Sequence, residues 1–171
     1  MAMPAQLDAE SPLGPISDRA RQFLVVVDGS PESWVAIRFA AGRAAHVHGG
    51  GLILFHVIPP GDFQHWMAVA ERMREEAREE AEALLGEVAS QVSAYAGLQP
   101  EVIIREGQPK EELQAFIEGR DDVFVLILGA NAEGDPGPLV DYFSGPLVGS
   151  LKCPVMIVPG SMSNEAIDAM V

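Results

Sequence analysis

Two apolar runs near the end of the chain constrain its fold more than any other feature. Residues 123–128 read VFVLIL and residues 154–158 read PVMIV, and both are rich in β-branched residues without polar alternation. Such runs are typical of strands buried on both faces, as in a parallel sheet. Parallel strands need a crossover between them, and residues 129–153 provide a loop rich in Gly and Pro and a short helical segment. The sequence therefore predicts a parallel α/β sheet.

The rest of the chain repeats this alternation of strand and helix. Further strands are predicted at residues 23–27, 52–58 and 102–104, and helices are predicted to follow Ser30, Asp62 and Gln108. The second of these helices has an apolar stripe that runs from Trp66 to Tyr95. This order of elements predicts a doubly wound five-stranded parallel sheet with helices on both faces. Its ligand crevice is expected beyond the carboxyl ends of the strands.

Chain length predicts one domain with two short extensions. At 171 residues the chain is long enough to bury roughly 70% of its unfolded surface in a single core. Residues 1–21 contain several prolines and little periodicity, so they are expected to form a flexible arm. Residues 22–160 are assigned to the α/β domain. Residues 161–171 form a tail in which Ser163 can cap a short helix that either packs on a partner or frays.

Charge and processing signals exclude several classes of partner. Acidic residues number 25 against 11 basic ones, and the net charge of −14 repels nucleic acids and anionic membranes. No apolar run approaches the roughly 20 residues that span a bilayer. The first residues lack the basic start and apolar core of a secretory signal, and the single cysteine cannot form an intramolecular disulfide. We therefore expect a soluble cytoplasmic protein without nucleic-acid or membrane partners.

Five segments, taken in order, resemble the universal stress protein family. They read FLVVVDGSPESWVAIRFAAGRAA from residue 23, LILFHVIPP from residue 52, VIIREGQPKEEL from residue 102, VFVLILGA from residue 123 and CPVMIVP from residue 153. Their order and spacing cover nearly the whole chain and are more specific than any single motif. The resemblance implies a flavodoxin-like fold with strand order 3-2-1-4-5. It also implies a homodimer formed by antiparallel pairing of the last strand, from Pro154 to Val158, with its copy.

Many members of this family bind ATP, and the resemblance implies where a nucleotide would lie in this chain. It places the ribose near Asp28, the adenine beside Val57, and the phosphates on a loop of pattern G-x2-G-x9-G-[ST] that follows the fourth strand. The candidate cofactor-binding residues are Asp28, Gly29, Ser30, Val57, Gly129, Ala132, Ser144 and Gly145. From the residues alone, the Asp28 carboxylate can equally cap the helix that follows it.

The phosphate loop departs from the family pattern. Gly129 occupies the first glycine position, but Ala132 and Tyr142 stand where the later glycines belong. A frame that starts at Gly134 instead reaches Leu147 at the last glycine position. The resemblance is therefore to a divergent member with an incomplete ATP-binding loop.

The chemistry of this loop also disfavours a triphosphate. Prolines at positions 136, 138 and 146 each remove a backbone N–H donor, and no Lys or Arg occurs from residue 121 to residue 151. A like charge about 6 Å from a phosphate costs on the order of 1–3 kcal/mol. No cofactor is therefore certain, and ATP with Mg²⁺ requires a metal that bridges Asp135 or Asp141 to the ligand. Otherwise the Gly and Pro residues only shape the crossover, and the crevice is empty or takes a smaller or less charged ligand.

No catalytic constellation is visible in the sequence. The four histidines show no metal spacing with cysteine or carboxylates, and His56 is expected to be a packed residue beside the crevice. Cys153 is expected to be a buried small apolar residue. We therefore expect no metal site and no catalytic residue. The prediction is a dimeric, non-catalytic binding or regulatory module of the stress response, with an unidentified protein partner.

Two other functions stay open at this stage. The first is an ATP-binding universal stress protein in which nucleotide occupancy or slow hydrolysis switches partner binding. The second, a redox or hydrolytic enzyme, would need a reactive Cys153 or a perturbed histidine.

Overall fold

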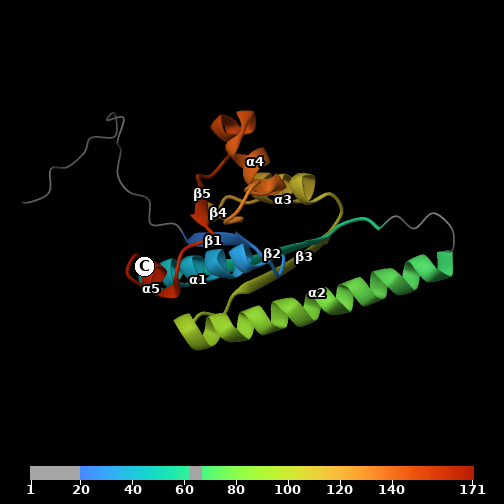
Figure 1. Ribbon diagram of the computed structural model, residues 1–171, viewed down its shortest axis with the longest axis horizontal. Helices are drawn as coiled ribbons and strands as arrows, with labels where there is room; N and C mark the ends of the chain where they lie inside the picture. The colour runs from blue at the N-terminus through green and yellow to red at the C-terminus, as the bar shows by residue number, and fades with distance from the viewer. Residues whose placement is uncertain (1–19, 62–66) are drawn as a thin grey trace, which may run out of the picture.

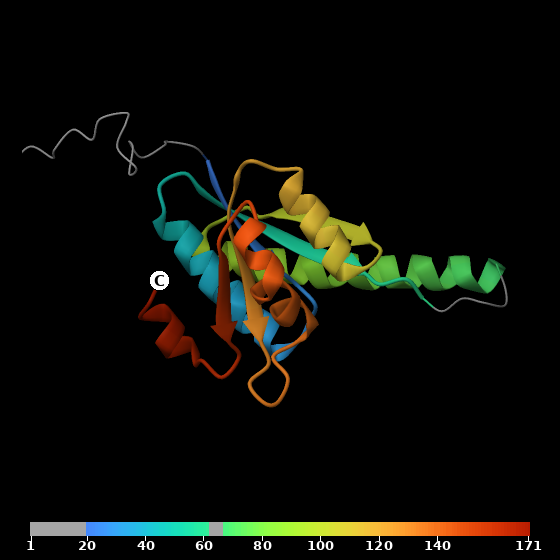
Figure 2. The same cartoon turned by 90° about the horizontal axis from the view of Figure 1, so that it is seen from above.

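The computed structural model describes residues 20–61 and 67–171, and a five-stranded sheet forms its centre (Figures 1 and 2). The strands are paired in the order β3-β2-β1-β4-β5, and every neighbouring pair is parallel. This confirms the flavodoxin-like, doubly wound sheet with strand order 3-2-1-4-5. The strands are β1 Arg21–Val26, β2 Gly50–Ile58, β3 Glu101–Glu106, β4 Val123–Ala130 and β5 Val155–Pro159.

Helices cover both faces of the sheet. Helices α1, α2 and α5 lie on one face, and α3 and α4 lie on the other (Figure 1). A 3₁₀ helix, η1, follows α4 and completes the crossover to β5. The helices are α1 Pro31–His46, α2 Met67–Ala96, α3 Pro109–Glu118, α4 Pro138–Ser144, η1 Pro146–Ser150 and α5 Asn164–Asp168.

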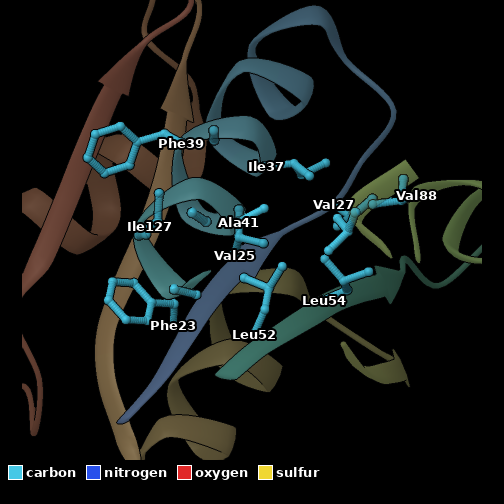
Figure 3. Close-up of a cluster of buried hydrophobic side chains, with 14 of the residues drawn as sticks. Phe23, Val25, Val27, Ile37, Phe39, Ala41, Leu52, Leu54, Val88 and Ile127 are labelled. Atoms are coloured by element: carbon cyan, nitrogen blue, oxygen red, sulfur yellow. The ribbon is translucent and has the colours of Figure 1, made fainter. Parts of the chain in front are cut away.

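The central strands are apolar on both faces because each face has its own core. Side chains alternate between the faces of a strand, so β1 sends Phe23 and Val25 to one core and Leu24 to the other. Figure 3 shows the first core, in which Val25, Leu52 and Ile127 of the sheet meet side chains of the covering helices. The continuous apolar runs in the sequence are thus explained by a sheet that is covered on both sides.

The last strand differs from the prediction made for it. Residues 154–158 were expected to be buried on both faces, but Met156 and Ile157 are each 40% exposed in the single chain. The reason is that, among the described residues, β5 lies at the edge of the sheet and pairs only with β4. The strand therefore presents apolar side chains at an unpaired edge.

Helix α2 is much longer than the sheet that it covers. Its 30 residues correspond to about 45 Å, and its N-terminal half projects beyond the sheet (Figures 1 and 2). Met67 is 91% exposed and Met73 is 46% exposed, so the predicted apolar stripe is buried only in the second half of the helix. Asp62 and Trp66 lie outside the described residues. The buried residues of α2 are Ala81, Leu85, Val88 and Val92.

The outer face of α2 carries the two predicted i,i+4 ion pairs. Arg72 lies 3.5 Å from Glu76, and Arg78 lies 3.6 Å from Glu82. All four side chains are at least half exposed, so this face is solvated as predicted. In the part of the chain that the structure describes, no helix combines the length and apolar character needed to cross a bilayer.

The two predicted extensions are described to different degrees. Most of the predicted flexible arm, residues 1–19, lies outside the described residues, and β1 begins at Arg21. The tail forms α5, where Ser163 accepts a hydrogen bond from the Ala166 N–H, and Ile167 is fully buried against this chain. The Asp168 carboxylate receives two hydrogen bonds from Arg38, at 2.8 and 2.6 Å, which lower the pKa of Asp168.

Candidate functional site

The turn after β1 holds one edge of the crevice in a fixed shape. Gly29 adopts a φ of 80°, which brings the chain around to the first residue of α1. The Asp28 carboxylate accepts a hydrogen bond from the Ser30 N–H at 2.9 Å, and the Ser30 hydroxyl accepts one from the Ser33 N–H at 3.2 Å. Ser30 is thus the N-cap of α1, and Asp28 closes the turn before it while also lining the crevice.

Ser33 connects this turn to the end of β1. Among the described residues, Ser33 is the one polar residue that is buried. Its hydroxyl donates to the Val26 carbonyl at 3.1 Å. The same hydroxyl accepts a hydrogen bond from the Asp28 N–H at 3.3 Å. Ser33 was not among the predicted site residues. A serine three positions after an N-cap serine, at the start of a buried helix, could have indicated it.

Gly129 is a glycine because β4 and α1 approach closely at this point. A Cβ atom at position 129 would lie 2.2 Å from the Glu32 carbonyl oxygen and 3.1 Å from the Ser33 nitrogen. The contact lies between backbones, so no side-chain rotation can relieve it. The glycine that the family pattern assigns to a phosphate loop therefore has a packing role that is independent of any ligand.

A cavity of about 230 Å³ opens at the carboxyl ends of β1, β2 and β4. Of the candidate residues, it brings together Asp28, Ser30, Val57 and Gly129. Its walls are mainly apolar, which suits a flat heterocycle better than a charged group. Further lining residues are Val26, Val27, Glu32, Ser33, Phe55, His56, Pro109, Leu113, Leu128, Pro136, Gly137, Pro138, Leu139 and Val140.

His56 lies where the sequence analysis expected a packed histidine. Its Nδ1 is 2.6 Å from the Val27 carbonyl oxygen, so this nitrogen donates and Nε2 is the acceptor in the neutral ring. Because the ring is tied to the backbone of β1, it forms part of the cavity wall.

Residues from α3 and α4 complete the cavity, and none of them was among the predicted cavity residues. Pro109 and Pro138 stand at the first turns of α3 and α4, and Leu113, Leu139 and Val140 follow them. A usable signal was present, because helices that follow parallel strands begin at the same edge where those strands end. Proline at the first helical position therefore marks residues close to the crevice.

Three backbone N–H groups of the loop after β4 are bonded within the loop. The Asn131 N–H donates to the Pro136 carbonyl at 3.1 Å, and the Glu133 N–H donates to the Asn131 side chain at 3.2 Å. The Gly137 N–H donates to the Asp135 carboxylate at 2.8 Å. Ala132 is exposed in this loop and does not line the cavity.

Ser144 and Gly145 lie at the far end of α4 and are not brought to the cavity. The Ser144 hydroxyl donates to the Val140 carbonyl at 2.6 Å. Gly145 ends the helix, and a Cβ atom there would lie 2.9 Å from the Asp141 carbonyl oxygen. Because α4 has seven residues, its two ends are separated by about 10 Å.

A second hollow, of about 470 Å³, adjoins the cavity on its outer side. The two hollows share Glu32, Gly137 and Pro138, and the outer one is also lined by Asn131, Lys110, Asp135 and Asp141. The outer hollow has the position expected for ligand phosphates, since it follows the loop after β4. Its charged groups are three carboxylates and one ammonium group.

Metal-binding and nucleophilic groups are not assembled at this site. Across residues 20–61 and 67–171, no group of three His, Cys, Asp or Glu side chains is placed to hold a metal ion. Cys153 is buried, and this burial raises the pKa of its thiol, which disfavours the reactive thiolate.

Comparisons with known proteins place this fold in a family. The sequence model of the universal stress protein family matches residues 20–159. A comparison with curated proteins gave no significant match. Among solved structures, universal stress protein UspA from Lactobacillus plantarum matches with a TM-score of 0.66 and 20% identity, over 83% of this chain and 99% of that chain.

Two further solved structures are similar over nearly the same part of the chain. A universal stress family protein from Burkholderia pseudomallei gives a TM-score of 0.64 and 18% identity, over 84% of this chain and 99% of that chain. A universal stress family protein from Arabidopsis thaliana, described with AMP bound, gives a TM-score of 0.59 and 17% identity. That match covers 81% of this chain and 91% of the other. At these identities the structural likeness demonstrates the shared fold.

Proposed function

Because this chain belongs to the universal stress protein family, we propose that it is a dimeric, non-catalytic binding module whose crevice takes an adenine ligand. The observation that carries the proposal is the cavity of about 230 Å³ at the carboxyl ends of β1, β2 and β4. Ligands of doubly wound sheets bind at this edge. The AMP bound to the Arabidopsis relative supports adenine as the heterocycle. Ligand occupancy would then change the affinity for a protein partner.

A second candidate function is an ATP-dependent switch. The outer hollow of about 470 Å³ favours it, because that hollow offers room for phosphates beyond the apolar cavity. Lys110 lines the outer hollow and supplies one positive charge. In this second function Mg²⁺ would have to bridge the phosphates to Asp135 or Asp141.

Calorimetric titration with adenosine, AMP and ATP, the last with and without Mg²⁺, tests both functions. Micromolar affinity for Mg²⁺–ATP would support the switch, and no binding of any of these at millimolar concentration would exclude both. Val57→Phe fills the apolar cavity and is expected to abolish binding. Val69→Phe, at an exposed position on α2, is the matched control and should bind as the wild type does.

The dimer is part of the proposal and depends on the edge strand β5. Met156 and Ile157 present apolar surface along an unpaired edge, which a two-fold copy of the strand would cover. We expect a dimer in light scattering at micromolar concentration and a monomer for Ile157→Asp. A monomeric wild type would refute this part of the proposal.

The absence of catalysis is likewise a proposal, and Cys153 provides its test. A buried thiol with a raised pKa should react slowly with iodoacetamide in the native state and rapidly in urea. Fast native alkylation, or steady ATP hydrolysis by the purified chain, would contradict the proposal. A cytoplasmic location agrees with a free cysteine and completes the proposed function.

A further inference from the structure

Resting on the proposed function, we infer that this crevice selects an uncharged nucleoside over its phosphorylated forms. The inference concerns the ligand class of the same site and follows from three features of its outer end. Three backbone N–H groups of the loop are already bonded within it, the side chains around the outer hollow carry a net negative charge, and the inner cavity is mainly apolar.

The first feature is the hydrogen bonding of the loop between β4 and α4. A phosphate is held by N–H groups that point at it, as in glycine-rich loops and nests. Here the N–H groups of Asn131 and Glu133 are used within the loop. The Gly137 N–H donates to the Asp135 carboxylate, so this donor already has an anionic acceptor. A phosphate would have to displace this carboxylate and then face its charge at short range.

The second feature is the charge around the two hollows. Asp28 and Glu32 line the inner cavity, and Asp135 and Asp141 join Glu32 around the outer hollow. Among the described residues that line either hollow, Lys110 is the one Lys or Arg. Four carboxylates and one ammonium group leave a net charge of −3 at the site. Each unpaired carboxylate about 6 Å from a phosphate weakens binding by about tenfold at an effective dielectric near 40.

The third feature is the inner cavity, which a neutral ligand can use without these penalties. Phe55, Val57 and Leu128 give it apolar walls that suit a heterocycle. One oxygen of Asp28 accepts the Ser30 N–H, and the other can accept a hydrogen bond from a ligand hydroxyl group. A carboxylate accepts equally well from an uncharged sugar, so the site does not require an anionic group on the ligand.

The first experiment compares adenosine, AMP and ATP by calorimetry on the full chain without divalent metal. We expect adenosine to bind at least tenfold more tightly than AMP, and AMP more tightly than ATP. Raising the ionic strength from about 0.02 to about 0.3 M should strengthen AMP binding, because salt screens repulsion. Tighter binding of AMP or ATP than of adenosine overturns the inference and leaves the proposed function in place. If none of the three binds, the proposed function itself fails.

A charge-neutralising variant separates electrostatics from cavity shape. Asp135→Asn removes the charge and keeps the oxygen that accepts the Gly137 N–H. Glu32→Gln removes the charge of a residue that lines both hollows. The double variant should bind AMP about a hundredfold more tightly and adenosine unchanged. The control Glu79→Gln removes one charge from an exposed position of α2 and should alter neither affinity. If the double variant keeps the wild-type ratio of AMP to adenosine affinity, the inference is wrong.

Discussion

Replacing Gly129 with alanine tests whether this glycine exists for packing or for ligand binding. The added Cβ would lie 2.2 Å from the Glu32 carbonyl oxygen and 2.6 Å from its carbonyl carbon. Non-bonded carbon and oxygen atoms need roughly 1 Å more, so α1 must shift away from β4. Overpacking of this kind costs about 1–3 kcal/mol, and we expect the upper end because both partners are backbone. For a chain of this length, about 3 kcal/mol corresponds to a fall in Tm of about 6–12 °C.

Thermal unfolding followed by circular dichroism measures this effect without any ligand. The matched control is Gly86→Ala in the exposed interior of α2, where a Cβ atom meets nothing within 4 Å. Alanine favours a helix over glycine by about 0.5–1 kcal/mol, so this variant should melt slightly above the wild type. If Gly129→Ala melts within about 2 °C of the wild type, the packing role of Gly129 is refuted. The glycine would then have to be explained by a ligand.

Two further predictions concern hydrogen bonds and charge. Ser33→Ala removes the hydroxyl that bonds both the Val26 carbonyl and the Asp28 N–H and should cost about 1–3 kcal/mol in urea unfolding, whereas Ser90→Ala on exposed α2 should not. Equal midpoints for the two variants would contradict this role. Arg120 donates two hydrogen bonds to Asp122 and so holds the pKa of this carboxyl below its ordinary value. The stability that the pair contributes is present above about pH 4 and is lost as pH falls through the lowered pKa. Asp122→Asn should therefore destabilise the protein at pH 6 but not near pH 2, and a pH-independent difference would exclude a titrating pair.

The fold was predictable because its central strands are apolar on both faces. Leu24 and Val25 point into opposite cores, and only a covered parallel sheet explains such continuous runs. The protruding half of α2 was not predictable, because its apolar stripe continues to Met73 with the spacing of a buried helix. Sequence periodicity reports which residues share a face and does not report where the partner surface ends.

The residues of the candidate site were likewise predictable only in part. Val57 and Gly129 lie in the last residues of their strands and Asp28 just beyond its own, so strand order alone brings them together. Ser144 was proposed from the family resemblance, and the length of α4 carries this residue away from the cavity. Glu32 was not among the candidate residues. Its place in both hollows depends on how closely α1 approaches β4, which is a tertiary distance.

The packing at Gly129 and the hydrogen bonding of the loop after it together hold the crevice in one shape. The packing of α1 on β4 fixes the floor of the crevice through backbone contacts, and the Asp135 carboxylate fixes the loop above it through the Gly137 N–H. Neither contact involves a ligand, so the crevice keeps its shape when it is empty. In a phosphate loop an anion would supply the acceptor that Asp135 supplies here. A side chain of the loop therefore performs the structural task of the phosphate, and we expect ligand binding to change the stability of this loop little.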